Sequence, residues 1–508
     1  MKRISVFLIF IIILGVLSGC DTINIDDPVF DNTSFNNNSA TPENNQIIKK
    51  LILPYNENNS LNPILVTDNL NNQMLRLVFQ SLVEYDENYK PVLILAKEYE
   101  NSGSKFTFTV DTSKAFHNGE KLSAYDVEYS FDIAKKNSQS IYNKNFSKIK
   151  SYGALSEDKF TVTFYDNYPE CLNLLTIPVI KNGSSSDDYI PNGTGAYKFI
   201  REDEKDYLKA VSENSKIKEI SLFTPKNNET YESCFETGII NVMYSDMDNT
   251  EDMGIGGSYS IKEYTQNKLT YLEFNSSNNL LQDKNLRKAI SLACDRNYFK
   301  TNLLLSHAKE AYSLFNPVWH KYREVSHETE TYSISKSASL LSENGYTVKD
   351  GNFYKGETKL AFRLLVNSSN KIKLSIAEKL KTDFALLGID IIIDSQPFET
   401  YKAMLLNKNF DIAVCETYID ADMDIKSMIS GDKNYGGFYS EELINAYNEF
   451  ENDNSKINGF LKAYDDFMPK VPLFFRNGGM FLNGRIKGEV NPTSLNCFFE
   501  FEKWNLEQ

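Results

Sequence analysis

Three aspartates alternate with apolar residues in the segment 418–424, which reads Tyr-Ile-Asp-Ala-Asp-Met-Asp. The segment follows a short apolar stretch, 410–415, whose pattern predicts a strand. A carboxylate at such a position can accept a charge-assisted hydrogen bond from a buried ammonium group, which must be paired. The alternative is an acidic loop that faces water. The spacing alone leaves both interpretations open for Asp420 and Asp422, with Tyr418 beside them.

The other side chains with catalytic or metal-binding chemistry are scattered. The four histidines form no i, i+4 pair with a carboxylate, and the cysteines show no C-x-x-C spacing. The sequence contains no G-x-S-x-G motif and no P-loop. We therefore expect no metal site, no cofactor and no enzymatic activity. Beyond Cys20, most of the remaining five cysteines are expected to be buried, with at most one disulfide among them: Cys171, Cys234, Cys294, Cys415 and Cys497.

The N-terminal residues have the pattern of a secretion signal. Two cations precede an apolar stretch, Val6 to Val16, that is too short to span a ~30 Å bilayer core as a helix. The following Leu-Ser-Gly-Cys20 resembles the cleavage site of bacterial lipoproteins, whose cysteine receives a lipid such as palmitate. An ordinary signal peptide with a chance cysteine is the alternative. The resemblance implies a signal peptide over 1–19 and a protein anchored at Cys20 to the outer face of the cell membrane.

The chain is strongly acidic. Its net charge is −15, and it becomes −17 when the first 19 residues, which carry two cations and no acidic residue, are removed. Such a charge excludes nucleic acid as a partner, because phosphate binding requires Lys and Arg. Residues 20–46 are rich in Asn and Asp and contain no Lys or Arg, which predicts a flexible tether. Beyond Val16 no apolar run is long enough to cross a membrane.

The first half of the chain predicts a mixture of helices and strands. Apolar residues at helical spacing begin at Leu70, after Thr67 and Asp68, either of which can cap a helix. Period-two alternation predicts half-buried strands over 105–110 and 159–164. Ser123 is placed to begin a helix between them. A turn at 193–195 precedes two further strands.

The second half has the rhythm of a βαβ unit. Strands are predicted over 360–366, 389–393 and 410–415, with an amphipathic helix over 371–387 and a shorter one over 400–406. Gly388 stands where a left-handed helix stop belongs. The continuous apolar run 391–393 predicts a strand covered on both faces. The sequence therefore predicts at least two lobes of α/β type.

Several segments, taken in order, resemble one family. The most specific is 115–127, Ala-Phe-His-Asn-Gly-Glu-Lys-Leu-Ser-Ala-Tyr-Asp-Val, and the others are 60–63, 91–96, 106–110, 193–197, 272–275 and 283–295. Together they resemble the oligopeptide- and dipeptide-binding lipoproteins of peptide/nickel-type ABC importers, over roughly residues 48 to 490. Within the signature, a turn at His117 and a helix cap at Ser123 indicate structural roles.

The resemblance implies an α/β, two-lobed periplasmic-binding-protein-like fold, type II, of the large peptide-binding subclass. Its N-terminal lobe would cover 47–275, with an extra subdomain over about 75–190. The second lobe would cover 276–478, and 479–508 would return to the first. Hinge closure of two lobes can bury a ligand between them.

The resemblance also assigns site residues. By that alignment the stretch 418–424 is the family's ligand loop: Asp422 falls on the position that pairs with a peptide α-ammonium, and Asp420 and Tyr418 stand beside it as further ligand-binding candidates. Thr67 and Asn69 fall where the first lobe holds the peptide backbone. Tyr142 would line the subdomain side of the site, or else be a surface aromatic. The family pattern is altered here, since Tyr418, Ile419 and Ile425 replace its Gly, Trp and Pro. The stretch 211–215 likewise replaces the family's N-P-x-Y-W.

Two functions remain open from the sequence. The resemblance implies a monomeric, membrane-anchored solute-binding component of an ABC importer, which captures a peptide or similar small solute and delivers it to a permease. The altered loop favours the alternative, a degenerate family member that acts as a surface sensor or structural lipoprotein. A binding site filled by the chain's own side chains would support that alternative.

Overall fold

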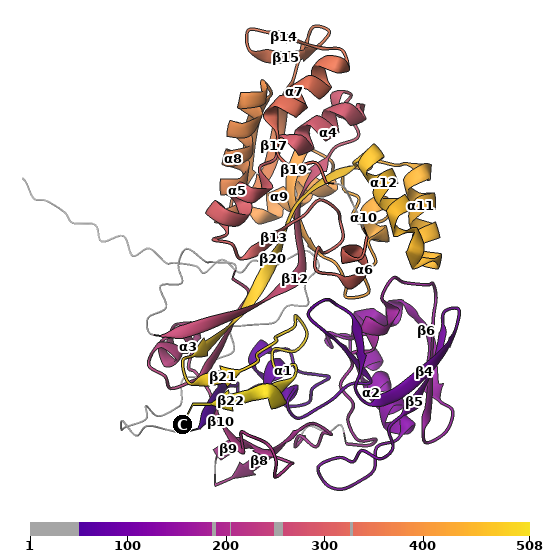
Figure 1. The fold of residues 1–508 in the computed structure, drawn as a ribbon, viewed down its shortest axis with the longest axis vertical. Coiled ribbons are helices and arrows are strands. Elements are labelled where there is room, and N and C mark those ends of the chain that lie inside the picture. The colour runs from indigo at the N-terminus through magenta and orange to yellow at the C-terminus, as the bar shows by residue number, and fades with distance from the viewer. Residues whose placement is uncertain (1–49, 185–188, 204, 248–257, 326–328, 508) are drawn as a thin grey trace, which may run out of the picture.

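The computed structural model describes residues 50–184, 189–203, 205–247, 258–325 and 329–507. Two lobes lie one above the other, and two long strands run between them (Figure 1). Cys20 and the predicted signal and tether lie outside the described residues, so those predictions stay predictions. Within the described ranges no helix combines the length and the apolar character that a membrane span requires.

The first lobe is built on a four-stranded sheet of order β1-β10-β9-β8. Its first strand pairs in parallel with β10, and the other pairs are antiparallel. Its core gathers residues from 51–220, 242–244 and 480–504. The sheet and its helices are β1 (Leu51–Pro54), β8 (Tyr197–Glu202), β9 (Lys205–Ala210), β10 (Glu219–Phe223), α1 (Asn69–Leu75) and α3 (Asn228–Glu236).

A second, antiparallel sheet of order β4-β5-β7-β6 belongs to the same lobe, with helix α2 packed on it. The predicted strands 105–110 and 159–164 are confirmed as β5 and β7, with alternate residues such as Phe108 and Phe160 fully buried. A capping box between Ser123 and Asp126 begins α2, as predicted. The elements here are β2 (Val83–Tyr85), β3 (Pro91–Leu93), β4 (Ala96–Ser102), β5 (Lys105–Val110), α2 (Ala124–Lys136), β6 (Ile149–Ala154), β7 (Lys159–Phe164) and the 3₁₀ turns η1 (Asn143–Ser147) and η2 (Cys171–Leu175).

One large sheet connects the two lobes. Its order is β11-β20-β12-β19-β17-β18, with β13 beside β20. The antiparallel strands β12 and β20 pair from Tyr259 with Asn483 to Glu273 with Lys470, and their register is irregular between Thr265 and Leu269. These are the long strands seen between the lobes in Figure 1. The strands are β11 (Val242–Ser245), β12 (Tyr259–Phe274), β13 (Ala308–Glu310), β17 (Ala361–Asn367), β18 (Asp390–Gln396), β19 (Ile412–Tyr418) and β20 (Lys470–Asn483).

The second lobe has helices on both faces of this sheet. Adjacent residues Leu364 and Leu365 on β17 point to opposite faces, and each joins a different hydrophobic cluster. The predicted helix 371–387 is confirmed as α8, which ends at Gly388 with φ 83°. The helices are α4 (Lys284–Leu292), α5 (Arg296–Tyr298), the π turn η4 (Phe299–Leu303), α6 (His320–Arg323), α7 (Ile334–Glu343), α8 (Lys371–Leu387), α9 (Phe398–Leu406), α10 (Lys426–Ser430), α11 (Glu441–Asn452) and α12 (Ile457–Phe467).

One prediction for this lobe is wrong. The apolar run 391–393 lies in β18, an edge strand that pairs only with β17, and this run is not covered on both faces. Its middle residue, Ile392, is 65% exposed. Three apolar residues in a row give a segment high β-propensity wherever it lies in a sheet. They therefore do not show whether other elements cover both of its faces.

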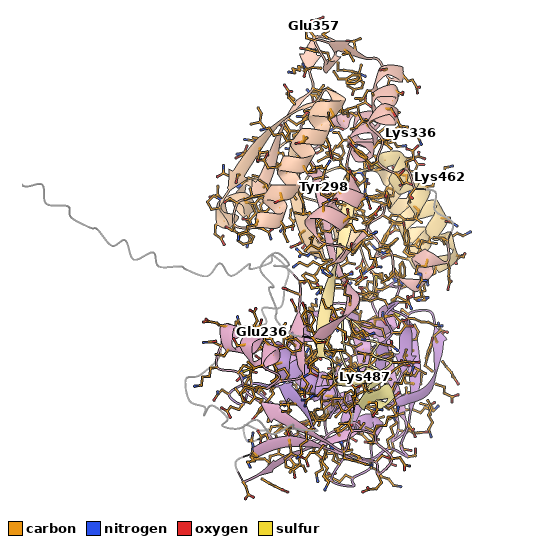
Figure 2. The ribbon with its side chains drawn as sticks, turned by 60° about the vertical axis from the view of Figure 1, so that its left-hand side comes forward. Glu236, Tyr298, Lys336, Glu357, Lys462 and Lys487 are labelled. Carbon is orange, nitrogen blue, oxygen red and sulfur yellow. The ribbon has the colours of Figure 1, made fainter. Side chains whose placement is uncertain are left out.

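The remaining short elements lie at the periphery. Charged side chains point outward from the second lobe, with Glu357 at its far end and Lys336 and Lys462 along its side (Figure 2). The five described cysteines are free, and four of them are buried as predicted. The peripheral elements are β14 (Tyr346–Lys349), β15 (Asn352–Lys355), β16 (Thr358–Lys359), β21 (Ile486–Gly488), β22 (Trp504–Leu506) and the 3₁₀ turns η3 (Leu280–Gln282), η5 (Asn454–Lys456) and η6 (Phe501–Lys503).

Candidate functional site

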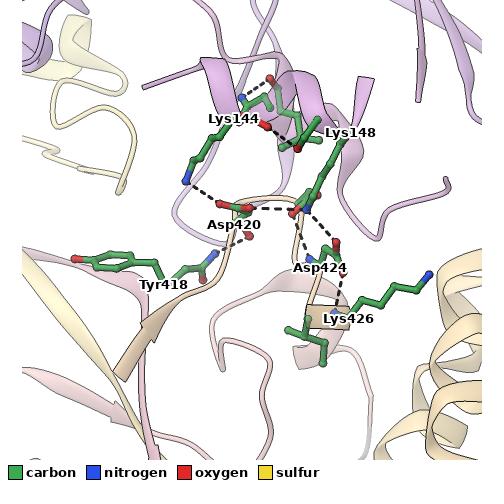
Figure 3. Close-up of polar contacts among 12 residues, drawn as sticks. Lys144, Lys148, Tyr418, Asp420, Asp424 and Lys426 are labelled. Carbon is green, nitrogen blue, oxygen red and sulfur yellow. Dashed lines mark hydrogen bonds and ion pairs between the residues drawn. The ribbon is translucent and has the colours of Figure 1, made fainter. Parts of the chain in front are cut away.

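The acidic loop, residues 419–425, leaves the end of β19 where the two lobes meet (Figure 3). Its backbone is fixed by local hydrogen bonds. The amide of Ile419 donates to the carbonyl of Asn267 at 2.9 Å, and the amide of Met423 donates to the carbonyl of Asp420 at 2.9 Å. Met423 has φ 58°, a left-handed conformation that turns the loop back on itself. The loop therefore presents its three carboxylates in a defined arrangement.

Two lysines of the first lobe meet these carboxylates. The ammonium of Lys148 lies 2.6 Å from Oδ2 of Asp422, 3.0 Å from Oδ2 of Asp424 and 3.8 Å from Oδ2 of Asp420. The ammonium of Lys144 lies 2.8 Å from Oδ1 of Asp420. Both lysines follow α2, at and just after η1. The second lobe thus contributes the acids and the first lobe contributes the bases.

Burial makes the central pair different from a surface ion pair. The side chain of Asp422 is fully buried, and that of Lys148 is 17% exposed. Burial raises the pKa of Asp422 to about 6 even though Lys148 opposes the rise, and Asp420 and Asp424 add to it. Burial would lower the pKa of Lys148, but the three carboxylates outweigh it and raise that pKa above its ordinary value. At neutral pH both groups are therefore charged.

A second polar cluster joins the lobes beside the first. The carboxylate Oε1 of the buried Glu170 accepts a hydrogen bond from Nε1 of Trp319 at 3.2 Å. The same oxygen lies 2.7 Å from Nε2 of His320 and 2.8 Å from the ammonium of Lys321. The amide of Glu170 donates to the carbonyl of Asp422 at 2.9 Å. Glu170 therefore links the acidic loop to the region around α6.

The side-chain amide of Asn173 completes this junction. Its Nδ2 donates to the carbonyl of Ala421 at 3.0 Å and to the carbonyl of Tyr89 at 2.9 Å. Glu170, just before η2, and Asn173, within it, thus act together with Lys144 and Lys148 to hold the acidic loop through both its side chains and its backbone. Because the contacts are numerous and mostly buried, the loop is fixed in place before any solute arrives.

The structure brings some of the predicted site residues together and leaves others apart. Asp420 and Asp422 lie at the junction of the lobes, so the interpretation of a loop that merely faces water is wrong for Asp422. Tyr418 ends β19, where its hydroxyl donates to Oε1 of Gln266 at 3.4 Å and its ring lies under the ammonium of Lys268, 5.5 Å from the centroid.

The three candidates from the first lobe occupy other positions. Thr67 and Asn69 are half-buried on either side of Asp68, which caps α1. Tyr142 is only 4% exposed, so it is not a surface aromatic, and its hydroxyl accepts a hydrogen bond from Nη2 of Arg76 at 2.8 Å. Within the described residues, the three loop carboxylates form their ion pairs with Lys144 and Lys148 and not with these three side chains.

Sequence reasoning missed Lys144, Lys148 and Glu170. The two lysines stand four residues apart, a spacing that places two cations near each other on a turn of helix. That spacing gives no indication of a partner, because the acidic loop is 274 residues away from Lys148 in the chain. Only the tertiary fold brings the acids and the bases together.

Two cavities are present elsewhere in the described part of the molecule. One, of about 290 Å³, is lined by residues of α3 and of the segment 483–485. The other, of about 280 Å³, lies beside Tyr312, Phe315 and Tyr322. The acidic loop lines neither cavity. In the described residues no group of three or more His, Cys, Asp or Glu is arranged to hold a metal ion.

Comparison with known proteins places the chain in a family. Residues 88–437 match the model of the bacterial extracellular solute-binding proteins, family 5. An oligopeptide-binding protein, AppA of Bacillus subtilis, is 21% identical over 491 residues, which cover 88% of this chain and 89% of the relative. A nickel-binding periplasmic protein of Escherichia coli is 23% identical over 360 residues, and the alignment covers 65% of this chain and 68% of the relative.

Solved structures share the fold. The unliganded open form of MppA, a periplasmic murein tripeptide binding protein, superimposes with a TM-score of 0.77 at 17% identity. The superposition covers 91% of this chain and 98% of the MppA chain. A nickel ABC transporter protein from Bacillus halodurans gives 0.75 at 18% identity, with 89% and 98% covered. These likenesses show the two-lobed α/β fold of type II periplasmic binding proteins. Because the family model matches well over half of the sequence, the chain belongs to the bacterial extracellular solute-binding proteins, family 5.

Proposed function

We propose that this protein is the solute-binding component of an ABC importer and that it captures a peptide or similar small solute between its two lobes. One observation carries the proposal beyond family membership. Asp422, at the junction of the lobes, is fully buried and already holds an ammonium group at 2.6 Å. The second lobe thus carries a carboxylate in an environment suited to a cationic group, beside the surface that a solute between the lobes would meet.

The connecting strands supply the motion that capture requires. The lobes are joined by β12 and β20, and the pairing of these strands is irregular between Thr265 and Leu269. Irregular pairing weakens a ladder locally and lets a strand bend more readily than a regular one. Rotation of one lobe against the other about this point would admit a solute, and closure would bury it. The affinity would come from burial and a few polar anchors, without covalent chemistry.

Recognition through main-chain groups favours a peptide-like solute. Relatives of this chain are named for oligopeptides and for nickel, so the family alone does not select the class. In peptide binding, main-chain hydrogen bonds supply much of the affinity and tolerate a change of side chains. That tolerance accommodates the replacements at Tyr418, Ile419 and Ile425. We therefore place peptides first, with Tyr418, Asp420 and Asp422 on the second lobe and Thr67, Asn69 and Tyr142 on the first as proposed site residues.

The cellular setting is part of the same proposal. A lipid on Cys20 would hold the mature protein at the outer face of the membrane, within reach of its permease, and raise its effective concentration there. The protein would act as a monomer and would have no enzymatic activity. Labelling of cells with a palmitate analogue tests the anchor. The wild-type protein is expected to carry the label, and a Cys20→Ser variant is expected to lose it.

Small-angle scattering tests the capture of a solute. The mature protein is measured alone and with a pool of short peptides, and binding is expected to change the distance distribution as the lobes rearrange. A Tyr439→Ser variant, which alters a side chain that is 70% exposed, is the matched control and should respond as the wild type does. An unchanged profile with peptide pools and with cell extract would count against the proposal.

A second function is favoured by a specific observation. The position expected to pair with a solute's amino group is occupied by Lys148, a side chain of the protein itself. This occupancy is what a degenerate member, serving as a surface sensor or structural lipoprotein, would show. The scattering experiment separates the two, since a degenerate member would keep one profile with every solute tried.

A further inference from the structure

We infer that Lys148 is an internal ligand of Asp422: its ammonium takes the place at this carboxylate that a solute's amino group would need. The solute is then recognised without a free amino group at Asp422. The inference therefore names a class of solute, one whose amino terminus is blocked, absent or held elsewhere. This part of the inference rests on the proposed function. The pairing of Lys148 with Asp422 does not rest on the proposed function, because it concerns two residues of the chain alone.

The first argument is that a cation from outside has no open approach to Asp422. Its Oδ2 accepts from Lys148 at 2.6 Å, and its Oδ1 lies 3.3 Å from the amide of Asp424. The carboxylate is fully buried, so water does not reach it. The backbone beside it is also engaged, because its carbonyl accepts the amide of Glu170 at 2.9 Å. An external ammonium could therefore reach Asp422 only after Lys148 had withdrawn.

The second argument is that Lys148 is held in position at its base and at its tip. Its amide donates to the carbonyl of Asn145 at 3.1 Å, and its own carbonyl accepts the amide of Tyr165 at 3.0 Å. Its ammonium lies 4.9 Å from the centroid of the Tyr168 ring, within the range of a cation–π contact. Asp424 and Asp420 supply two further carboxylates. A side chain fixed in this way loses little further entropy when it pairs with Asp422.

The third argument is one of competition. Where geometry allows the contact, a group tethered to the same molecule acts at an effective concentration on the order of millimolar. A solute present at about 1 µM would face a disadvantage of roughly a thousandfold in competing for the same carboxylate. A solute whose affinity depended on that carboxylate would therefore bind poorly. One that does not use it would lose nothing.

Lys144 offers a matched contrast on the same turn of the chain. It also pairs with the acidic loop, but its side chain is 51% exposed and its partner, Asp420, is 38% exposed. Water can solvate both groups when this pair is broken, so removing Lys144 leaves no buried charge behind. Removing Lys148 leaves the buried carboxylate of Asp422 without its nearest cation.

Rescue by small amines tests the inference. The mature Lys148→Ala variant is heated in 0 to ~50 mM ethylammonium or n-propylammonium chloride, with sodium chloride at equal ionic strength as the reference. An amine that enters the vacated space and pairs with Asp422 stabilises the folded state by mass action. We expect the unfolding temperature of Lys148→Ala to rise by several degrees. The wild type, Lys144→Ala and the double variant Lys148→Ala/Asp422→Asn should not respond beyond the salt reference.

Every outcome of the amine experiment either supports or overturns the pairing of Lys148 with Asp422. A Lys148→Ala variant that folds and ignores the amines, or a wild type that responds as strongly as the variant, overturns the inference. If Lys148→Ala does not fold, recovery of folded protein in Lys148→Ala/Asp422→Asn supports an unpaired buried charge as the cause, and failure of both overturns it. None of these readouts involves a transported solute. The scattering experiment can therefore fail while the amine rescue succeeds, or the reverse.

Discussion

The ammonium of Lys148 and the carboxylate of Asp422 lie 2.6 Å apart and belong to different lobes. The contact joins a turn after α2 to the loop after β19, two segments separated by 274 residues in the chain. It places an internal cation against the carboxylate that the family resemblance assigns to a solute's amino group. The pair therefore bears both on how the lobes are held together and on what the protein can bind.

The first prediction concerns the stability that this pair confers. Lys148→Met keeps the aliphatic stem but removes the charge, so it leaves Asp422 buried and unpaired. We expect a loss of about 3–5 kcal/mol in the free energy of unfolding, measured in urea. The matched Lys144→Met variant breaks an exposed pair and should lose less than about 1 kcal/mol. Equal losses for the two variants would show that burial at Asp422 plays no special part.

The second prediction concerns the neighbouring contact between the lobes. Glu170→Gln keeps the shape of the side chain but removes the charge that faces Lys321 and accepts from Trp319. We expect a loss of about 2–3 kcal/mol in unfolding free energy, because buried donors are left poorly paired. We also expect scattering to report a larger radius of gyration, since a contact between the lobes is weakened.

The control for this prediction is Glu357→Gln. The side chain of Glu357 is 94% exposed, and its pair with Lys349 lies at the far end of the second lobe. Its unfolding free energy should stay within about 0.5 kcal/mol of the wild type. A Glu170→Gln variant that matches this control in both stability and radius would contradict the role given to Glu170.

The third prediction concerns pH. Burial would raise the pKa of Glu416, but Lys268, Lys373 and Arg476 outweigh it and lower that pKa to about 2. A carboxyl group whose pKa is lower in the folded state than in the unfolded state stabilises the fold. For Glu416 this stabilisation is fully present at pH values above the pKa of the unfolded state, 4.5, and it is lost as the pH falls through the pKa of the folded state, about 2. Glu416→Gln should therefore lose about 3 kcal/mol at pH 7. The gap to the wild type should close between about pH 4.5 and 2, as followed by urea unfolding across that range. A gap that is constant with pH would contradict the charge account.

The fourth prediction concerns two glycines. A Cβ at Gly195 would lie 2.4 Å from the carbonyl oxygen of Leu77, so Gly195→Ala forces backbone apart at the turn 193–195. We expect a loss of more than about 2 kcal/mol, or a failure to fold. Gly459 lies within α12, and a Cβ there would meet nothing within 4 Å. Gly459→Ala should instead raise the unfolding temperature, since alanine is favoured in a helix by about 1 kcal/mol. The reverse order of the two effects would contradict the packing described for these positions.

Much of the fold could be predicted because its signals are local. The alternation over 105–110, the cap at Ser123 and the stop at Gly388 each depend on neighbouring residues, and the structure confirms all three. The prediction failed for the strand 391–393, because the coverage of its two faces depends on what packs against the sheet at that edge, where Ile392 is left 65% exposed. The neighbours of β18 are set by the topology of the whole sheet, which no window of a few residues contains.

Only half of the candidate site could be predicted from the sequence. The acidic loop is conspicuous in the sequence, since carboxylates alternate over 420–424, and the family resemblance added a role for Asp422. Its partners were not predictable, because Lys148 and Glu170 look like ordinary polar residues when read alone. Their importance comes from burial and from contacts across the junction of the lobes, which only the assembled fold creates.

The most direct measurement is native mass spectrometry of the mature protein with an equimolar pool of short peptides, each present in a free and an N-acetylated form. The account predicts that the wild type retains peptides and holds the two forms within about twofold of each other, because Lys148 already pairs with Asp422. It also predicts that Lys148→Ala enriches the free form, by roughly tenfold for each 1.4 kcal/mol gained. A wild type that retains no peptide would contradict the proposed function. One that strongly enriches the free form would contradict the occupancy of Asp422 by Lys148.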